Sequence, residues 1–126
     1  MVEPKPEEEY VHYKGGDKRY RVKYRAIGNP GIDINDPRYK FLYTARNCED
    51  AGEESPVLEQ LVSLNGHPKG TLWIKGGELG VDYITYEMLY DTCEFPSGTI
   101  WSRSLGRFTD FKQLGGMEVK RFTRIQ

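Results

Sequence analysis

The feature that most constrains the fold is a run from Lys18 to Ile27 in which apolar and charged residues alternate. Its apolar members are Tyr20, Val22, Tyr24 and Ala26, and its charged members are Arg19, Arg21, Lys23 and Arg25. Because successive side chains of a strand point to opposite faces, a period of two predicts a half-exposed antiparallel strand. We therefore expect a strand whose exposed face carries four cations, about 7 Å apart along the chain.

Composition favours a β-rich fold. The 126 residues include 14 glycines, 7 prolines, 9 tyrosines, 5 phenylalanines and 2 tryptophans. This combines turn formers with side chains that suit a pleated, half-buried surface. A chain of this length can bury one core without the help of a metal or a disulfide. The counts disfavour a fold made only of helices.

Other segments predict further short strands, at residues 10–13, 40–46, 71–75, 79–91, 99–105 and 117–125, with a short element at 110–113. The pair Gly76-Gly77 predicts a hairpin that joins residues 71–75 to residues 79–91. One segment indicates a helix instead. Ser55-Pro56 is typical of a helix start, and apolar residues follow at helical spacing as far as Leu64, although a strand over residues 59–64 is the alternative.

The predicted fold is mostly β, or α+β at most: a small curled antiparallel sheet or an SH3-like barrel of about six or seven strands with one short helix. Residues 1–9 hold two prolines and four glutamates, and we expect them to form a disordered acidic tail. Residues 10–126 are expected to form a single β-rich domain.

The formal net charge of −1 hides an uneven distribution. Residues 10–27 hold six cations against Asp17, which gives +5, and residues 99–126 hold six cations against two carboxylates, which gives +4. The segments between them are neutral or acidic. Both flanks of the predicted domain are therefore basic.

Four motifs resemble a known family. They are His12-Tyr13-Lys14-Gly15 with Tyr20-Arg21-Val22, the strand Ile84–Tyr90, the segment Trp101–Phe108, and Lys120-Arg121-Phe122-Thr123. Their order and character resemble the DUF1653 family of small bacterial and phage proteins, a domain of unknown function. Ser104, Arg107 and Lys120 stand where that family has proline, methionine and proline, and residues 30–80 replace a short connection. The resemblance covers about half the chain and implies no activity.

The strongest functional signal is the set of cations. Arg19, Arg21, Lys23 and Arg25 would join Arg121 and other cations of the last strand if the terminal strands pair, and aromatic residues lie among them. Arginine binds phosphate bidentately, and aromatic rings provide stacking surfaces for bases. Lys14 precedes a glycine turn that can offer amides to a phosphate. The alternative is a solvated face whose cations pair with carboxylates of the same chain.

A second candidate lies in the strand over residues 99–105. Trp101 and Arg103 share one face of it, and Ser102 and Ser104 share the other. We expect Trp101 and Arg103 to line a ligand pocket with Tyr86 and Arg107 nearby. The alternative is a buried tryptophan beside a guanidinium that pairs with a carboxylate such as Glu87.

Other chemistries find little support. The two histidines and two cysteines are isolated from one another in sequence, so no metal site, no cofactor and no disulfide is expected. No catalytic residue is assigned, since His12 with Ser102 or Ser104 matches no known nucleophile motif. With no apolar run that could span a bilayer and no signal peptide, a cytoplasmic protein is expected.

These features favour a non-enzymatic binding module for an anionic, nucleotide-like or phosphate-bearing ligand. The expected partner is a nucleotide or another anionic small molecule, or else a nucleic acid, and no membrane. One alternative is a protein-interaction module or homo-oligomer that uses an exposed strand edge. The other is a small hydrolase or transferase.

Overall fold

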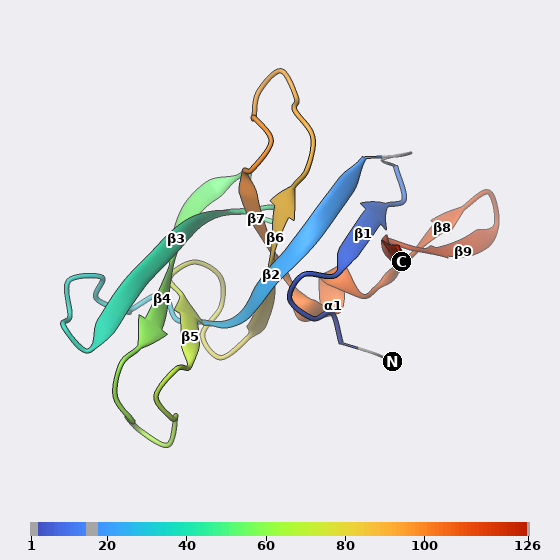
Figure 1. Ribbon diagram of the computed structural model, residues 1–126. Helices are drawn as coiled ribbons and strands as arrows, with labels where there is room; N and C mark the ends of the chain where they lie inside the picture. Colours follow the sequence, from blue (N-terminus) through green and yellow to red (C-terminus); the bar gives the residue numbers. More distant parts are fainter. Residues whose placement is uncertain (1–2, 15–17, 126) are drawn as a thin grey trace.

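The computed structural model describes residues 3–14 and 18–125 (Figure 1). In chain order the elements are β1 (Glu9–His12), β2 (Arg19–Gly28), β3 (Tyr39–Asn47), β4 (Glu53–Gln60), β5 (Leu72–Ile74), β6 (Asp82–Met88), β7 (Ile100–Ser104), α1 (Leu105–Phe108), β8 (Phe111–Leu114), β9 (Met117–Lys120) and β10 (Phe122–Ile125). The mostly β prediction is confirmed. No helix among the described residues is long and apolar enough to cross a membrane.

Six strands close into a barrel. Eight strands form one sheet in the order β10-β1-β2-β5-β4-β3-β7-β6, and an additional β2–β6 pairing closes the ring from β2 to β6. Most neighbours are antiparallel, but β2–β5 and β3–β7 are parallel. Of the two predicted folds, a curled sheet and a barrel, the chain adopts the barrel. β1 and β10 extend the sheet beyond β2.

Two cores lie on opposite faces of β6. Inside the barrel, one cluster draws on β2, β3, β4, β5 and β6; its buried members are Ala26, Ala45, Val57, Ile74 and Tyr83. Outside the barrel, a second cluster lies under β1, β10 and α1; its buried members are Tyr10, Val22, Ile84, Tyr86, Phe108 and Phe122. Residues 83–86 of β6 are therefore all buried, alternately facing one core and the other.

A β-bulge in β2 overturns the prediction that its four cations share one exposed face. Arg21 pairs with Glu87 and Val22 with Tyr86, but the register then shifts by one residue, so that Arg25 pairs with Ile84. Since directly paired residues share a face, Arg25 lies on the opposite face of the sheet from Arg21. Tyr24, predicted to be buried, is exposed beside the bulge. The four cations do not share one face.

The predicted helix at residues 56–64 is wrong, because residues 53–60 form β4. Val57 faces the barrel interior, while Leu58 packs outside with Ile32 and Trp73. A strand buried on both faces carries consecutive apolar residues, and such a run also fits helical spacing. The only helix of the described residues is the short α1.

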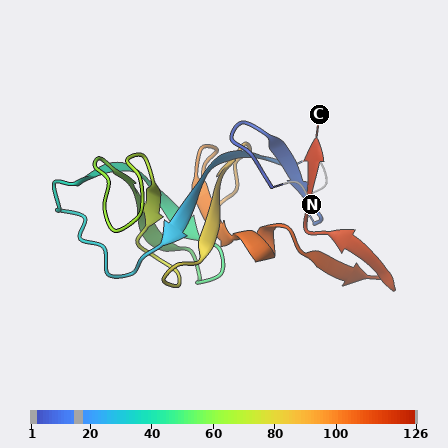
Figure 2. The same ribbon diagram turned by 90° about the horizontal axis from the view of Figure 1, so that it is seen from below.

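The predicted hairpin of residues 71–75 with residues 79–91 is also wrong. β5 pairs with β4 and β2, and β6 pairs with β2 and β7. The predicted final strand is divided at Arg121 into β9 and β10. β9 and β8 form a separate hairpin that projects from the body (Figure 2). Phe111, Leu114 and Met117 are exposed on it.

The acidic segment before β1 packs against the sheet, unlike the predicted disordered tail. The Glu7 amide donates to the Val22 carbonyl at 2.9 Å, and the Val22 amide donates to the Glu8 carbonyl at 2.8 Å. Pro4 is buried. Residues 3–9 therefore form part of the domain, and residues 1–2 lie outside the described residues.

Thr85 holds the bulge. Its hydroxyl accepts a hydrogen bond from the Tyr24 amide at 3.1 Å, donates to the Tyr24 carbonyl at 2.7 Å and lies 2.8 Å from the Tyr43 hydroxyl. We predict that Thr85→Val lowers the unfolding free energy by about 2–3 kcal/mol, because several polar groups lose their partner. Thr85→Ser keeps the hydroxyl and should cost about 1 kcal/mol for the lost methyl. Denaturant unfolding measures both, and a valine variant as stable as the serine variant would contradict this role.

Candidate anion-binding site

A cavity of about 410 Å³ lies on the outer face of β6 and β7, beneath the loop of residues 89–99. Its walls come from β1, β2, the turn after β3, β6, this loop, β7 and β10. The aromatic rings that line it are those of His12, Tyr20, Tyr86, Tyr90, Phe95, Trp101 and Phe122. Cys48 and Arg103 also line it. Its volume falls within the range of small-molecule sites, and most of its lining residues are aromatic.

Trp101 and Arg103 share this cavity because of their places in β7. Trp101 pairs with Tyr86 and Arg103 pairs with Ile84, so both side chains lie on the outer face of the barrel wall. Ser102 is turned the other way and is buried. The alternation of the sequence predicted this arrangement, and the structure brings Trp101, Arg103 and Tyr86 together as expected.

Arg103 is only 9% exposed, yet it takes part in none of the ion pairs among the described residues. Its Nη2 donates to the Cys48 Sγ at 2.9 Å, and its guanidinium carbon lies 5.6 Å from the ring centre of Phe122. Its Nε is buried without a hydrogen-bond partner. Buried charges usually pair with an opposite charge, so this guanidinium has unused capacity for an anion.

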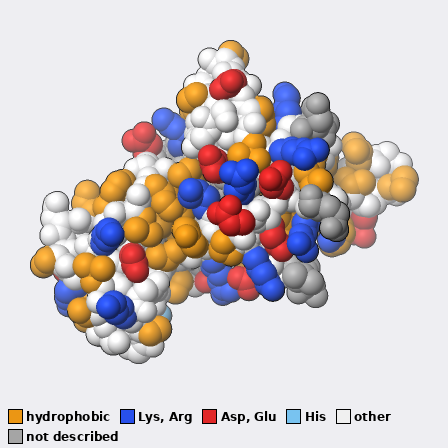
Figure 3. All heavy atoms as spheres, in the orientation of Figure 1, with side chains coloured by type: hydrophobic (Ala, Val, Ile, Leu, Met, Phe, Trp, Pro, Cys, Tyr) orange, Lys and Arg blue, Asp and Glu red, His pale blue; other side chains and the backbone are white. Residues whose placement is uncertain are grey.

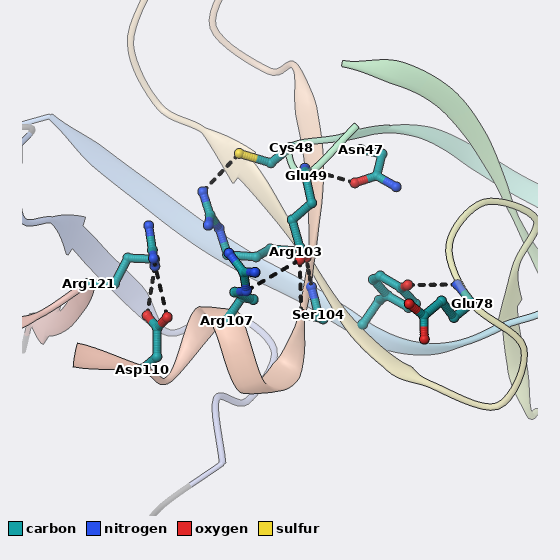
Figure 4. Close-up of polar contacts among 10 residues, drawn as sticks. Asn47, Cys48, Glu49, Glu78, Arg103, Ser104, Arg107, Asp110 and Arg121 are labelled. Carbon is teal, nitrogen blue, oxygen red and sulfur yellow. Dashed lines mark hydrogen bonds and ion pairs between the residues drawn. The ribbon is translucent and has the colours of Figure 1, made fainter. Parts of the chain in front are cut away.

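The carboxylates near Arg103 are engaged by other groups (Figure 4). Glu49 accepts hydrogen bonds from the amide and hydroxyl of Ser104 and lies 4.0 Å from the Nε of Arg107. Asp110 accepts two hydrogen bonds from Arg121, at 2.7 and 3.2 Å. The predicted alternative partner, Glu87, lies beside Arg21 instead.

The aromatic wall is held in place by contacts among its own members. The Tyr20 hydroxyl hydrogen-bonds to the Tyr90 hydroxyl, which ties β2 to the loop over the cavity. Phe95 from the same loop packs edge-on against Trp101, with ring centres 5.0 Å apart. Burial raises the pKa values of Tyr20 and Tyr86, so both phenols stay neutral and can donate a hydrogen bond.

His12 is a neutral member of the cavity. Burial, aided by the nearby cations Arg103, Arg121 and Lys14, lowers the pKa of its imidazole from 6.5 to about 4. Its Nδ1 accepts a hydrogen bond from the Lys14 amide at 3.2 Å, so the proton resides on Nε2. An N–H donor is therefore available on His12 at neutral pH.

The cations of β2 lie outside this cavity and have acidic neighbours. Arg19 lies 3.9 Å from Glu9, and Arg21 lies within 4.0 Å of carboxylates of Glu7, Glu9 and Glu87. Arg25 binds Glu3 and Asp82, each at 2.6 Å. The Lys23 ammonium lies 5.5 Å from the ring centre of Tyr43. Figure 3 shows basic and acidic side chains intermingled over this region.

The remaining predicted residues also lie apart. Arg107 on α1 is largely exposed, and Arg121 is buried in its bidentate pair with Asp110. Lys14 is exposed beside Tyr13, and the glycines of its turn fall outside the described residues. None of these three cations lines the cavity.

A second cavity, of about 440 Å³, lies between β10 and the β8–β9 hairpin. Its cations are Lys120 and Arg124, and Arg124 lies 3.4 Å from the Glu8 carboxylate. Both cations are exposed. This second cavity has no buried, unpaired charge. It is therefore a weaker candidate for anion binding than the cavity at Arg103.

Sequence reasoning missed Cys48, Tyr20, Tyr90 and Phe95 as members of this cavity. They come from distant segments, and no local motif marks them. Among residues 3–14 and 18–125, no three His, Cys, Asp or Glu side chains gather as a metal site requires. Comparisons of the chain with protein-family models, with curated proteins and with solved structures find no match. The DUF1653 resemblance stays a prediction.

Arg103 should be dispensable for stability. We predict that Arg103→Met leaves the unfolding free energy unchanged or raises it by up to about 2 kcal/mol, because a buried cation without a carboxylate is replaced by an apolar side chain of similar length. Arg121→Met is the matched control: it leaves Asp110 without its partner and should cost roughly 3 kcal/mol. Denaturant unfolding midpoints measure the stability of both variants. A loss of stability in Arg103→Met as large as that in Arg121→Met would show that Arg103 has a structural role.

His12 should make stability depend on pH. Its imidazole binds a proton near pH 6.5 when unfolded but only near pH 4 when folded. Between these values the unfolded state holds more protons, so the unfolding free energy should fall as pH decreases through this window. His12→Gln has no such proton to bind, and the difference between the two stability curves isolates the effect. Parallel curves would show that the folded environment does not disfavour the imidazolium.

Proposed function

We propose that the chain is a non-enzymatic binding module for a small anion that carries a planar ring, such as a nucleotide or an aromatic phosphate. The observation that supports the proposal most strongly is the guanidinium of Arg103, which is 9% exposed, unpaired with any carboxylate of the described residues and placed in an aromatic cavity. A bound phosphate or carboxylate would supply the missing negative charge.

The cavity also offers groups for the rest of such a ligand. Trp101, Phe95 and Tyr90 provide aromatic surface, and stacking of a base on such a ring contributes about 1–3 kcal/mol. His12 and the buried tyrosines provide neutral hydrogen-bond donors. Glu94 is the only carboxylate among the lining residues, and its side chain belongs to the exposed loop. An anionic group is therefore favoured at the Arg103 end.

The cations of β2 have a smaller part in this proposal. Their carboxylate neighbours from the acidic segment and from β6 neutralise much of their charge, and exposed cations of this kind are screened by salt. A ligand bound through one buried guanidinium would show a weak dependence on salt, unlike a nucleic acid bound across many phosphates.

The test is isothermal titration with nucleoside mono- and diphosphates, with phenyl phosphate and with inorganic phosphate, at low and physiological salt. We expect Arg103→Met to weaken binding of every phosphate ligand about 10- to 100-fold, since a charge-assisted hydrogen bond contributes about 1.5–3 kcal/mol. Trp101→Leu should weaken binding of the ring-bearing ligands and leave inorganic phosphate unchanged.

Two variants serve as matched controls. Arg107→Gln and Arg21→Gln each remove one exposed cation outside the cavity and should change affinity by less than about twofold. If these variants weaken binding as much as Arg103→Met does, the anion is attracted by overall surface charge. If none of these phosphate ligands binds the wild-type protein at all, the proposal fails.

A further inference from the structure

Cys48 occupies a position in the cavity that the proposed binding function does not use. It follows β3 directly, and its amide donates to the Ser102 carbonyl at 2.9 Å, which fixes it beside β7. Its side chain is half-buried and lines the cavity. The other thiol, that of Cys93, is exposed in the loop of residues 89–99.

The Cys48 sulfur has a cation as its hydrogen-bond partner. Arg103 Nη2 donates to Sγ at 2.9 Å, a short distance for a nitrogen–sulfur contact (Figure 4). The guanidinium therefore lies against the atom that would attack a substrate, because sulfur is the nucleophilic atom of cysteine. Aromatic side chains line the cavity around the pair.

The second observation concerns the other nitrogens of the same guanidinium. Among the described residues the guanidinium donates only through Nη2, and the fully buried Nε has no partner, so the charge of the group is left for an incoming anion. An anionic group that binds Arg103 would lie within a few ångströms of the Cys48 sulfur. The cavity thus places a nucleophile and an anion anchor side by side.

We propose that Cys48 is a nucleophilic thiol that forms mixed disulfides with small disulfides carrying a carboxylate or phosphate group. In this step the Cys48 thiolate attacks one sulfur of the disulfide, a new S–S bond forms, and the original S–S bond breaks. The departing sulfur leaves as a thiolate with the bonding electron pair, and the proton of the Cys48 thiol passes to water. No other oxidant is required, because the disulfide itself is reduced.

Arg103 would contribute to this reaction by holding the acidic group of the substrate near the Cys48 sulfur. A neutral disulfide gains no such anchor. Selectivity for anionic over neutral disulfides is therefore the signature that separates this site from an ordinary accessible thiol.

The experiment compares the two thiols one at a time. Cys93→Ser leaves only Cys48, and Cys48→Ser leaves only Cys93. Each variant reacts with dithiobis(nitrobenzoate), an aromatic disulfide with two carboxylates, and with the neutral aromatic dithiodipyridine; the absorbance of the released thionitrobenzoate or thiopyridone gives the rate. We expect Cys48 to react with the anionic probe about tenfold faster than Cys93 at neutral pH, and to favour it over the neutral probe more strongly than Cys93 does.

Arg103 variants in the Cys93→Ser background test the cause. Arg103→Met should remove both the rate advantage and the preference for the anionic probe, whereas Arg103→Lys, which keeps a charge, should retain part of each. In denaturant the two thiols should react alike. Equal rates at Cys48 and Cys93 in the folded protein, or a preference that survives Arg103→Met, would overturn the proposal.

The inference rests on the same cavity as the proposed binding function, but the two can fail separately. Cys48→Ser should keep reversible nucleotide or phosphate binding, measured by titration, while losing covalent capture. Reversible binding without fast reaction at Cys48 would overturn only the inference about the thiol. Fast, Arg103-dependent reaction without any reversible ligand would overturn only the binding function.

Discussion

The burial of β6 on both faces is the constraint on which the rest of the structure depends. Tyr83 and Thr85 face the barrel interior, while Ile84 and Tyr86 face the outer core under β1, β10 and α1. The β2–β6 pairing that closes the barrel also brings Val22 into the outer core. One strand thus joins the barrel to the layer outside it, and the cavity lies on this second layer.

The cavity combines a stable aromatic frame with one charge that the fold does not satisfy. Phe108 stacks on Phe122, and the Tyr20 and Tyr90 hydroxyls are hydrogen-bonded to each other. Arg103 lies within this frame. The nearby carboxylates of Glu49 and Asp110 interact instead with Arg107, Arg121 and the Ser104 amide. Polar groups left unsatisfied in an otherwise well-paired structure are concentrated at functional sites, because a ligand or a reaction can use them.

Charge in this chain is balanced locally. The alternating cations of β2 meet glutamates of the segment before and within β1, which the structure brings alongside them. The acidic segment and the basic strand are separate in the sequence. In the fold they lie side by side and form a network of exposed ion pairs. Each pair adds little to stability, but together they neutralise much of the charge of β2.

Local patterns in the sequence were sufficient to predict the strands β1, β2, β3, β5, β6 and β7, the β-rich class, and the shared face of Trp101 and Arg103, because alternation is a property of neighbouring residues. They were misleading where a strand is buried on both faces, as at Leu58, and where a bulge reverses the alternation, as at Arg25. Only the tertiary structure decided barrel closure, the parallel neighbours of β2 and β3, and the meeting of Cys48, His12 and Tyr90 around Arg103. These depend on pairing between segments far apart in the chain, and such pairing is set by how whole strands pack together rather than by the residues beside each one.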